Sequence, residues 1–243
     1  DMRPVRRNNS PITGEFAKYE DAKPELISRL GLFCSYCERR IATLLAVEHI
    51  EPKDKVPALE KVWHNFLLAC VNCNSCKSNK IVNFSELLFP DRDNTFHSYI
   101  YLDDGTITVN PILSVQQKKQ AQDTLALVGL DKPMQTYSDS NDEVVALDRS
   151  GQRMEAIATA QQSLSLLETS PEIEALKQSI VISAKEAGFF SIWMKVFNAH
   201  PQMKILFIKA FKGTEDSGCF NMQTSAPITP APNPDELSNG GKV

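Results

Sequence analysis

Two pairs of cysteines carry the clearest chemical signal in this sequence of 243 residues. Cys34 and Cys37 form one pair, Cys70 and Cys73 form the other, and two residues separate the members of each pair. Four thiolates in two such pairs can hold one structural zinc ion in a tetrahedral arrangement. Cys76 repeats the same spacing after Cys73, so spacing alone leaves open which cysteines form the second pair.

His49 is the candidate general base between the two cysteine pairs. An imidazole titrates near neutral pH and can accept a proton from an attacking water molecule. A histidine at the end of a strand is more often structural when it stands alone. Here Glu48 directly precedes it and cysteine pairs lie on both sides, which favours a catalytic role.

The order of these residues resembles that of the HNH endonucleases, also called ββα-metal nucleases. The resemblance covers about the first third of the chain. Its motifs are a Cys-x-x-Cys pair, Glu48-His49-Ile50-x-Pro52, Asn65 before a short apolar strand, and a second Cys-x-x-Cys pair with Asn74-x-x-Lys77 directly after it. In the family register an asparagine follows the last zinc ligand. The resemblance therefore implies that Cys34, Cys37, Cys70 and Cys73 bind the structural Zn²⁺.

The same resemblance implies a second, catalytic metal ion. In the family the acidic residue before the histidine holds a divalent ion, which carries over to Glu48, with Asn74 as the other side-chain ligand and Asn79 as the alternative. A partly hydrated site with oxygen ligands suits Mg²⁺ or Mn²⁺. The ion would neutralise phosphate charge while His49 activates water. Asn65, the middle residue of the family's name, is implied to fix the loop and orient the base.

The charge of the chain is unevenly distributed. The net charge is −4, with +3 in residues 1–80 and −7 in the remainder. A basic head on an acidic body predicts that the head contacts phosphate and the body contacts protein. The basic arm over residues 2–11 is expected to be either a solvated tail or a phosphate contact. Phosphate contacts are also predicted for four cations near the cysteines: Arg39, Arg40, Lys77 and Lys80.

The sequence predicts an α+β fold that is mostly α, with a zinc-braced nuclease module in residues 1–83. Within this module the pattern favours a helix over residues 20–31, strands over Ile41–Val47 and Phe66–Ala69, and a helix that begins near Asn72. A hairpin and one helix bury too little apolar surface to be stable unaided, so zinc would hold them together.

Residues 84–219 are expected to form a hairpin and a helical region that binds a partner. The turn Asp103-Asp104-Gly105 indicates the hairpin. Helices are predicted over residues 115–128, 152–168, 171–187, 189–199 and 201–211, with a polar linker at 131–150. Residues 220–243 contain few large apolar side chains, which predicts a disordered tail. Cys219, His97 and His200 are interpreted as structural residues.

Beyond the nuclease motifs, the chain resembles the PtuB family, the HNH partners of the PtuA ATPase in bacterial Septu antiphage defence and in retron operons. Residues 2–7 and 88–93 carry this likeness. It implies a nuclease effector in complex with PtuA and, in a retron, with a reverse transcriptase and its RNA–DNA product. No apolar run is long enough to span a bilayer, and the cysteines have metal-binding spacing. We therefore expect a cytoplasmic protein.

The substrate stays open at the level of sequence. A metal ion and a base act on the phosphate, so the site suits DNA, the default of the family, or RNA, including tRNA, in a toxin-like effector. Two alternatives are not enzymes: a zinc-bearing module that only binds nucleic acid, and an assembly subunit whose helices matter most. Substitution of His49 separates these classes, because only a nuclease would lose its activity.

Overall fold

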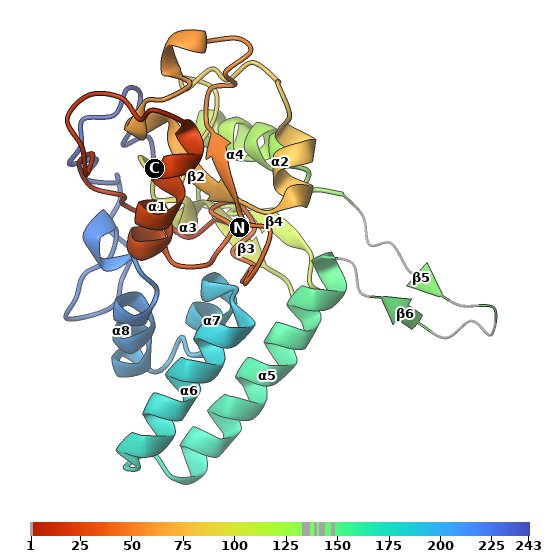
Figure 1. The fold of residues 1–243 in the computed structure, drawn as a ribbon. Helices are drawn as coiled ribbons and strands as arrows, with labels where there is room; N and C mark the ends of the chain where they lie inside the picture. The colour runs from red at the N-terminus through yellow and green to blue at the C-terminus, as the bar shows by residue number, and fades with distance from the viewer. Residues whose placement is uncertain (1, 133–136, 139, 141–143, 147–148) are drawn as a thin grey trace.

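The computed structural model describes residues 2–132, 137–138, 140, 144–146 and 149–243. The fold is α+β and mostly α, as predicted. Figure 1 shows strands β1 to β4 and the neighbouring helices gathered in one body, from which helices α5 and α6 extend side by side and β5 and β6 project separately. Among the described residues, no helix combines the length and the apolar character that a membrane crossing requires.

A short hairpin and its connection carry Glu48, His49 and Asn65. Strand β1 (Ala46–His49) pairs antiparallel with β2 (Phe66–Ala69), so that His49 lies opposite Phe66. The connection contains two 3-10 helices, η2 (Pro57–Leu59) and η3 (Trp63–Asn65). Helix α2 (Val71–Lys77) follows β2 directly. The second strand lies where the sequence predicted it.

The first strand differs from its prediction at Ile41–Val47, because β1 begins only at Ala46. The residues before Ala46 make other backbone contacts. The backbone N–H of Ile41 donates to the carbonyl of Leu32, and Arg39 forms an isolated bridge with Gly188. The intervening chain is a loop. Apolar character alone does not distinguish such a loop from a strand.

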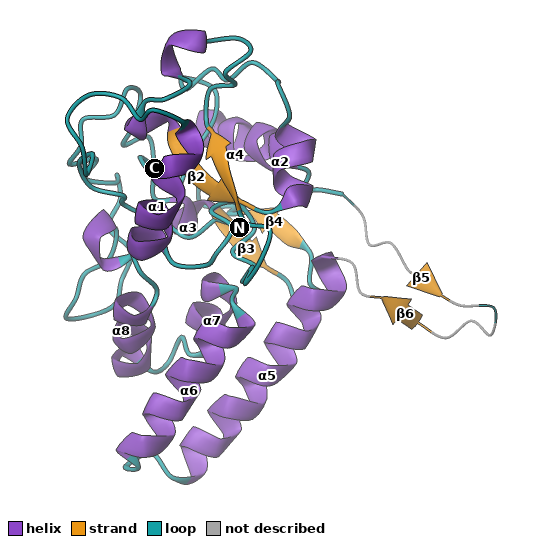
Figure 2. Cartoon of the chain, viewed as in Figure 1, coloured by secondary structure: helices purple, strands orange, loops and turns teal. Residues whose placement is uncertain are grey.

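The remaining elements follow the predicted order, and Figure 2 distinguishes their helices and strands. Before the hairpin lie η1 (Tyr19–Ala22) and α1 (Lys23–Leu30). After α2 come α3 (Thr95–Ser98), β3 (Tyr99–Tyr101), β4 (Ile107–Val109), α4 (Val115–Val128), β5 (Tyr137–Ser138) and β6 (Val144–Ala146). Then follow α5 (Arg149–Thr169), α6 (Glu174–Ala187), α7 (Phe190–Val196), α8 (Pro201–Ala210) and η4 (Glu215–Ser217).

Two of these elements test specific sequence predictions. Strands β3 and β4 pair around the predicted turn at Asp104-Gly105, which confirms the hairpin. The helix predicted to open at Pro171 begins instead at Glu174, after a turn. The predicted linker over 131–150 lies partly outside the described residues, and within it β5 pairs with β6.

The core consists of two apolar clusters that do not divide at residue 83. The first cluster joins side chains from the N-terminal segment, the hairpin and α4, including Met2, Leu26, Trp63, Phe66 and Leu125. The second lies among α5 to α8 and includes Phe33, Phe190, Trp193 and Phe207. The hairpin therefore shares an apolar cluster with α4, which the sequence assigned to the helical region.

The N-terminal arm is neither a solvated tail nor a free phosphate contact, and both expectations are wrong. Arg3 and Arg7 are 3% and 2% exposed. The guanidinium of Arg3 donates to the carbonyl of Leu30 at 2.9 Å, and that of Arg7 forms an ion pair with Asp91 at 2.8 Å. Buried arginines of this kind hold the arm against the body.

Residues 220–243 are packed, in contrast to the predicted disorder. The backbone N–H of Asn94 donates to the carbonyl of Val243 at 3.0 Å, and Lys242 forms an ion pair with the buried Asp93 at 3.0 Å. Main-chain groups and charged side chains make these contacts. A prediction from the shortage of apolar residues could not anticipate them.

Candidate active site and metal centre

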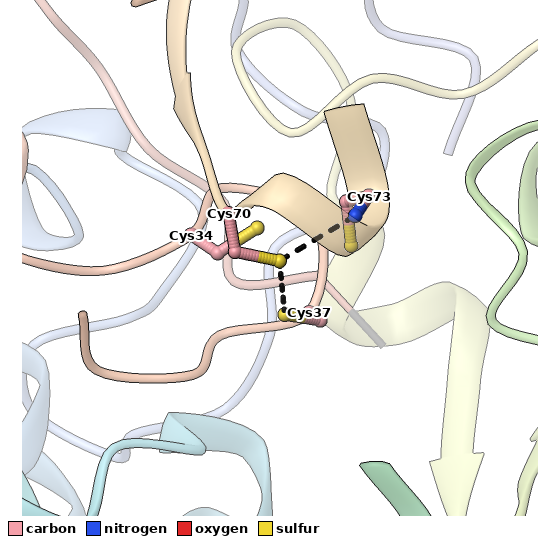
Figure 3. Close-up of side chains that lie close together, drawn as sticks. All are labelled: Cys34, Cys37, Cys70 and Cys73. Carbon is pink, nitrogen blue, oxygen red and sulfur yellow. Dashed lines mark hydrogen bonds between the residues drawn. The ribbon is translucent and has the colours of Figure 1, made fainter. Parts of the chain in front are cut away.

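The four predicted zinc ligands lie together. The sulfur atoms of Cys34, Cys37, Cys70 and Cys73 are buried and lie within 4.8 Å of one another. Figure 3 shows them converging from the turn after α1 and from the start of α2. Zinc–thiolate bonds of about 2.3 Å at tetrahedral angles require sulfur atoms about 3.8 Å apart. The Sγ atoms of Cys37 and Cys70 are 3.7 Å apart, so the set fits zinc.

The surroundings of the four thiols shift their pKa values in opposite directions: burial raises the pKa of Cys34, and hydrogen bonds with the other thiols raise that of Cys73. Hydrogen bonds from the neighbouring thiols lower the pKa of Cys70. The guanidinium of Arg149 lies 3.7 Å from the sulfur of Cys73, which places a positive charge beside the cluster. Cys76 lies outside this group, and its sulfur accepts a hydrogen bond from Lys132 at 3.3 Å. The geometry therefore matches the ligand set from the family register.

His49 stands at the end of β1 with one ring nitrogen already engaged. Its Nε2 lies 2.8 Å from the backbone carbonyl oxygen of Glu60. A carbonyl only accepts hydrogen bonds, so the neutral ring carries its proton on Nε2 and leaves Nδ1 as the proton acceptor. Burial lowers the pKa of His49, which favours the neutral ring. The rings of Tyr19 and Phe66 pack against the imidazole at ring-centre distances of 4.8 and 5.3 Å.

Asn65 connects the two loops that flank His49. Its side-chain oxygen accepts a hydrogen bond from the N–H of Glu51 at 2.8 Å, and its amide nitrogen donates to the carbonyls of Glu51 and Leu59. The next carbonyl after Leu59, that of Glu60, is the one that holds the imidazole. Asn65 is thus placed to fix the loop that orients the base, without touching the imidazole itself.

Glu48 is buried, and its carboxylate is paired. The ammonium of Lys77 lies 2.8 Å from Oε1, and the hydroxyl of Tyr36 donates to the same oxygen at 3.5 Å. Burial raises the pKa of Glu48, and the charge of Lys77 opposes this rise. Among the residues that the structure describes, no hydrogen bond engages Oε2. One carboxylate oxygen is therefore left for another ligand.

Lys77 differs from its predicted role as a phosphate contact. Its side chain is 1% exposed, and its ammonium also donates to the carbonyl of His49 at 2.7 Å. Lys77 therefore holds the end of β1 to α2 through its contacts with Glu48 and with the carbonyl of His49. The other predicted cations are more accessible: Arg39 donates to Gln152, Arg40 pairs with Glu186, and Lys80 is exposed.

A cavity of about 290 Å³ brings the candidate catalytic residues together. Glu48 and His49 both line it, although successive residues of an ideal strand face opposite sides. Asn74 and Asn79, the two alternatives for the second metal ligand, line it as well. The carboxylate of Glu48 with an amide oxygen of Asn74 or Asn79 suits a partly hydrated Mg²⁺ or Mn²⁺ that also binds a substrate phosphate, and Asp54 adds a second carboxylate to the lining.

Several residues of this site were not singled out from the sequence. Tyr19, Lys53 and Asp54 line the cavity, and Tyr36 contacts Glu48. Lys53 and Asp54 follow Pro52 of the motif directly, so their nearness to His49 in the chain was an available signal. The two tyrosines come from segments before the hairpin, and no local pattern marks them.

A comparison with protein-family models matches residues 34–80 to a model described as HNH endonuclease. The matched segment contains both cysteine pairs and the residues His49, Glu48, Asn65 and Asn74. It supports the HNH family for this segment and a nuclease-type function that depends on metal. A search of curated proteins finds no match.

Proposed function

We propose that the protein is a metal-dependent endonuclease that hydrolyses phosphodiester bonds in nucleic acid. The observation that carries the proposal is the cavity that His49, Glu48 and Asn74 line together, beside an imidazole whose Nε2 is held by the carbonyl of Glu60. These groups are a base and two oxygen ligands on one side of a zinc-braced hairpin.

In this proposal His49 accepts a proton from the attacking water through Nδ1. The carbonyl of Glu60 holds the protonated Nε2 and stabilises the imidazolium that forms. Asn65 acts as a positioning residue, because it ties the loop before Glu60 to the chain after β1. Lys77 keeps the carboxylate of Glu48 ionised and in place.

A divalent ion would be held by Glu48 and Asn74, with Asn79 as the alternative to Asn74. When bound, Mg²⁺ or Mn²⁺ supplies charge neutralisation at the phosphate and stabilises the leaving oxygen. The single carboxylate agrees with Mg²⁺ sites that use one or two carboxylates and retain several water molecules.

The finer parts of the proposal rest on the resemblance to the PtuB family. On that basis the enzyme is a cytoplasmic effector of antiphage defence that acts in complex with PtuA, and in a retron with a reverse transcriptase and its RNA–DNA product. DNA is the default substrate, and RNA, including tRNA, is the alternative. The acidic remainder of the chain supports a role in binding a protein partner.

One observation favours a second candidate, a zinc-bearing subunit that binds nucleic acid or assembles a complex without cutting. The ion pair between Lys77 and Glu48 occupies one oxygen of the only carboxylate among the implied metal ligands. In a non-catalytic module this pair would simply hold the hairpin to α2.

A cleavage assay separates the two candidates. The protein, alone and with PtuA, is incubated with plasmid or total RNA and with Mg²⁺ or Mn²⁺, and the new ends are sequenced. We expect cleavage that His49→Ala reduces by about 10²- to 10⁴-fold, the usual contribution of a general base. His64→Ala is the matched control and should cut normally. Equal activity of wild type and His49→Ala would support the non-catalytic candidate.

A further inference from the structure

A second cavity, of about 590 Å³, opens between the loop that precedes β1 and the side of α5. Its lining includes residues 39–44 and Val71 on one side, and Gln152, Glu155 and Thr159 of α5 on the other. We call this cavity the side groove. None of the residues that line it lines the cavity around His49.

The side groove and the catalytic cavity share two walls. On α2, Val71 lines the side groove and Asn74 lines the catalytic cavity, three residues further along. Three residues of helix rise about 4.5 Å along the helix axis. On the chain that enters and forms β1, Leu44 lines the side groove and Val47 lines the catalytic cavity. A strand that continues from His49 along α2 would therefore meet the side groove next.

The rim of the side groove exposes large apolar side chains. Leu44 is 79% exposed and Val71 is 59% exposed. Leu44 also has a φ of +59°, in the left-handed region that a residue with a Cβ rarely adopts. Strain of this kind is concentrated at functional sites. Beyond the other end of α2, Ile81 is 77% exposed. The path along α2 thus has apolar side chains at both ends.

Apolar side chains beside a phosphate-cleaving site suit one feature of nucleic acid, the flat face of a base. In a duplex these faces are stacked inside the helix, so only an unpaired or unstacked base offers its face to a protein. The interior of the side groove continues this surface with Ala156 and Phe189.

The polar groups of the side groove suit a nucleotide as well. Arg39 and Arg40 line it together with one carboxylate, that of Glu155. The guanidinium of Arg39 donates to Gln152 across the groove at 3.2 Å, while its buried Nε has no partner in the described part of the chain. Arg40 is partly neutralised by Glu186. The charge attracts phosphate only modestly, so the apolar contacts carry the larger share.

We infer that the side groove binds an unpaired nucleotide next to the phosphate that is cut. Leu44 and Val71 are then specificity-determining residues that select single-stranded or locally unpaired nucleic acid. The inference rests on the proposed endonuclease function, because it defines where the strand continues from the catalytic cavity.

Binding measurements test the side groove without cleavage. The protein carries His49→Ala, and fluorescence anisotropy follows its binding to a labelled 12-nucleotide single strand, as DNA and as RNA, and to the matching duplexes. Apolar area that is buried against a base contributes to binding, so the double change Leu44→Ser and Val71→Ser should weaken binding to the single strands by about tenfold. Binding to the duplexes should be unchanged. Val115→Ser is the control, because that side chain is 87% exposed at the start of α4 and does not line the groove.

A blocking variant provides a second measurement. Thr159→Trp places a large ring in the side groove and should also weaken single-strand binding, whereas Gln161→Trp, on the same helix outside the groove, should not. The inference is overturned if the groove variants bind single strands as tightly as the parent protein does. That holds even if the same variants lose binding to a protein partner.

The outcome is separable from that of the proposed function. If the wild-type protein cuts nucleic acid and the groove variants cut single strands equally well, the groove inference fails and the endonuclease proposal stands. If the wild-type protein cuts nothing but the groove variants lose binding to single strands, catalysis fails and the nucleotide site stands.

Discussion

The ammonium of Lys77 lies 2.8 Å from Oε1 of Glu48, and the two side chains are 1% and 2% exposed. This ion pair joins the last residue of α2 to the strand that ends in His49. A charge pair with so little access to water is costly to break, because the remaining partner stays buried without compensation.

Substitution Lys77→Met should therefore destabilise the protein by about 3–5 kcal/mol at pH 7. Burial already raises the pKa of Glu48, and removal of Lys77 raises it further. A carboxyl with a raised folded-state pKa binds protons more tightly in the folded state, so stability falls as pH rises above the unfolded value of about 4.3. The loss should thus be smaller near pH 4 than at pH 7, as measured by urea unfolding. The exposed Lys80→Met is the control, and an equal loss at both pH values would contradict the pairing.

The pH dependence of cleavage should report the protonation of His49. A general base acts in its neutral form, so activity should rise with pH through the pKa of His49. Burial lowers this pKa, which places the midpoint of the acidic limb of kcat/KM below the ordinary value of about 6.5. A profile of kcat/KM from pH 4.5 to 8 checks this. A midpoint above 6.5, or one that moves in His64→Ala, would assign the limb to another group.

Substitution Asn65→Ala should reduce turnover, although Asn65 does not touch the reacting atoms. It removes the partners of the Glu51 backbone and of the Leu59 carbonyl, which should cost about 1–3 kcal/mol of stability. Loss of loop position should lower kcat more than it raises KM, because His49 loses its orientation. Steady-state kinetics at a temperature where the variant is folded measure this difference. An unchanged kcat in the folded variant would leave Asn65 with a structural role alone.

Zinc should be bound at one ion per chain and should be needed for folding. Substitution Cys70→Ser should remove the metal and unfold the hairpin, because the ligands otherwise hold β2 and α2 to the turn after α1. Cys76→Ser should keep its zinc, since that sulfur lies outside the cluster. Elemental analysis together with circular dichroism tests both variants. Loss of zinc from Cys76→Ser would favour the other cysteine register.

Removal of residues 231–243 should lower stability, whereas a disordered segment could be removed without effect. The truncation takes away the partners of two buried groups, the carboxylate of Asp93 and the backbone N–H of Asn94. We expect a loss of several kcal/mol, as is typical when a buried charge loses its partner. The midpoint of urea unfolding measures the loss. Gln223→Ala, an exposed change within residues 220–243 but before the truncation, should leave the midpoint in place.

Elements with local signals were predicted well. Helix α4 begins after Ser114, whose hydroxyl accepts a hydrogen bond from the N–H of Gln117, and it ends at Gly129, which has a φ of +66°. Both signals can be read within a few residues of the chain. The spacing of the cysteines left Cys76 open as a ligand, and the family register predicted which four sulfur atoms meet.

Segments held by distant contacts were predicted poorly. Arg7 pairs with Asp91, and Arg6 pairs with Asp235 at 2.7 Å. Neither pair has a signature in the sequence, so the arm and the tail read as polar and unstructured. The candidate site shows the same limit. Its motif residues were predicted from the sequence, but the buried ion pair between Glu48 and Lys77 has no signature in the sequence.

The first apolar cluster also limits where the nuclease segment can be cut out of the chain. The family match spans residues 34–80, yet Met2, Leu26 and Leu125 from outside those limits belong to the same apolar cluster as Trp63. A peptide excised at the borders of the match would carry every zinc ligand but would expose much of the surface that these neighbours cover. Transplanting this nuclease segment into another protein would therefore require α1 and α4 to travel with it.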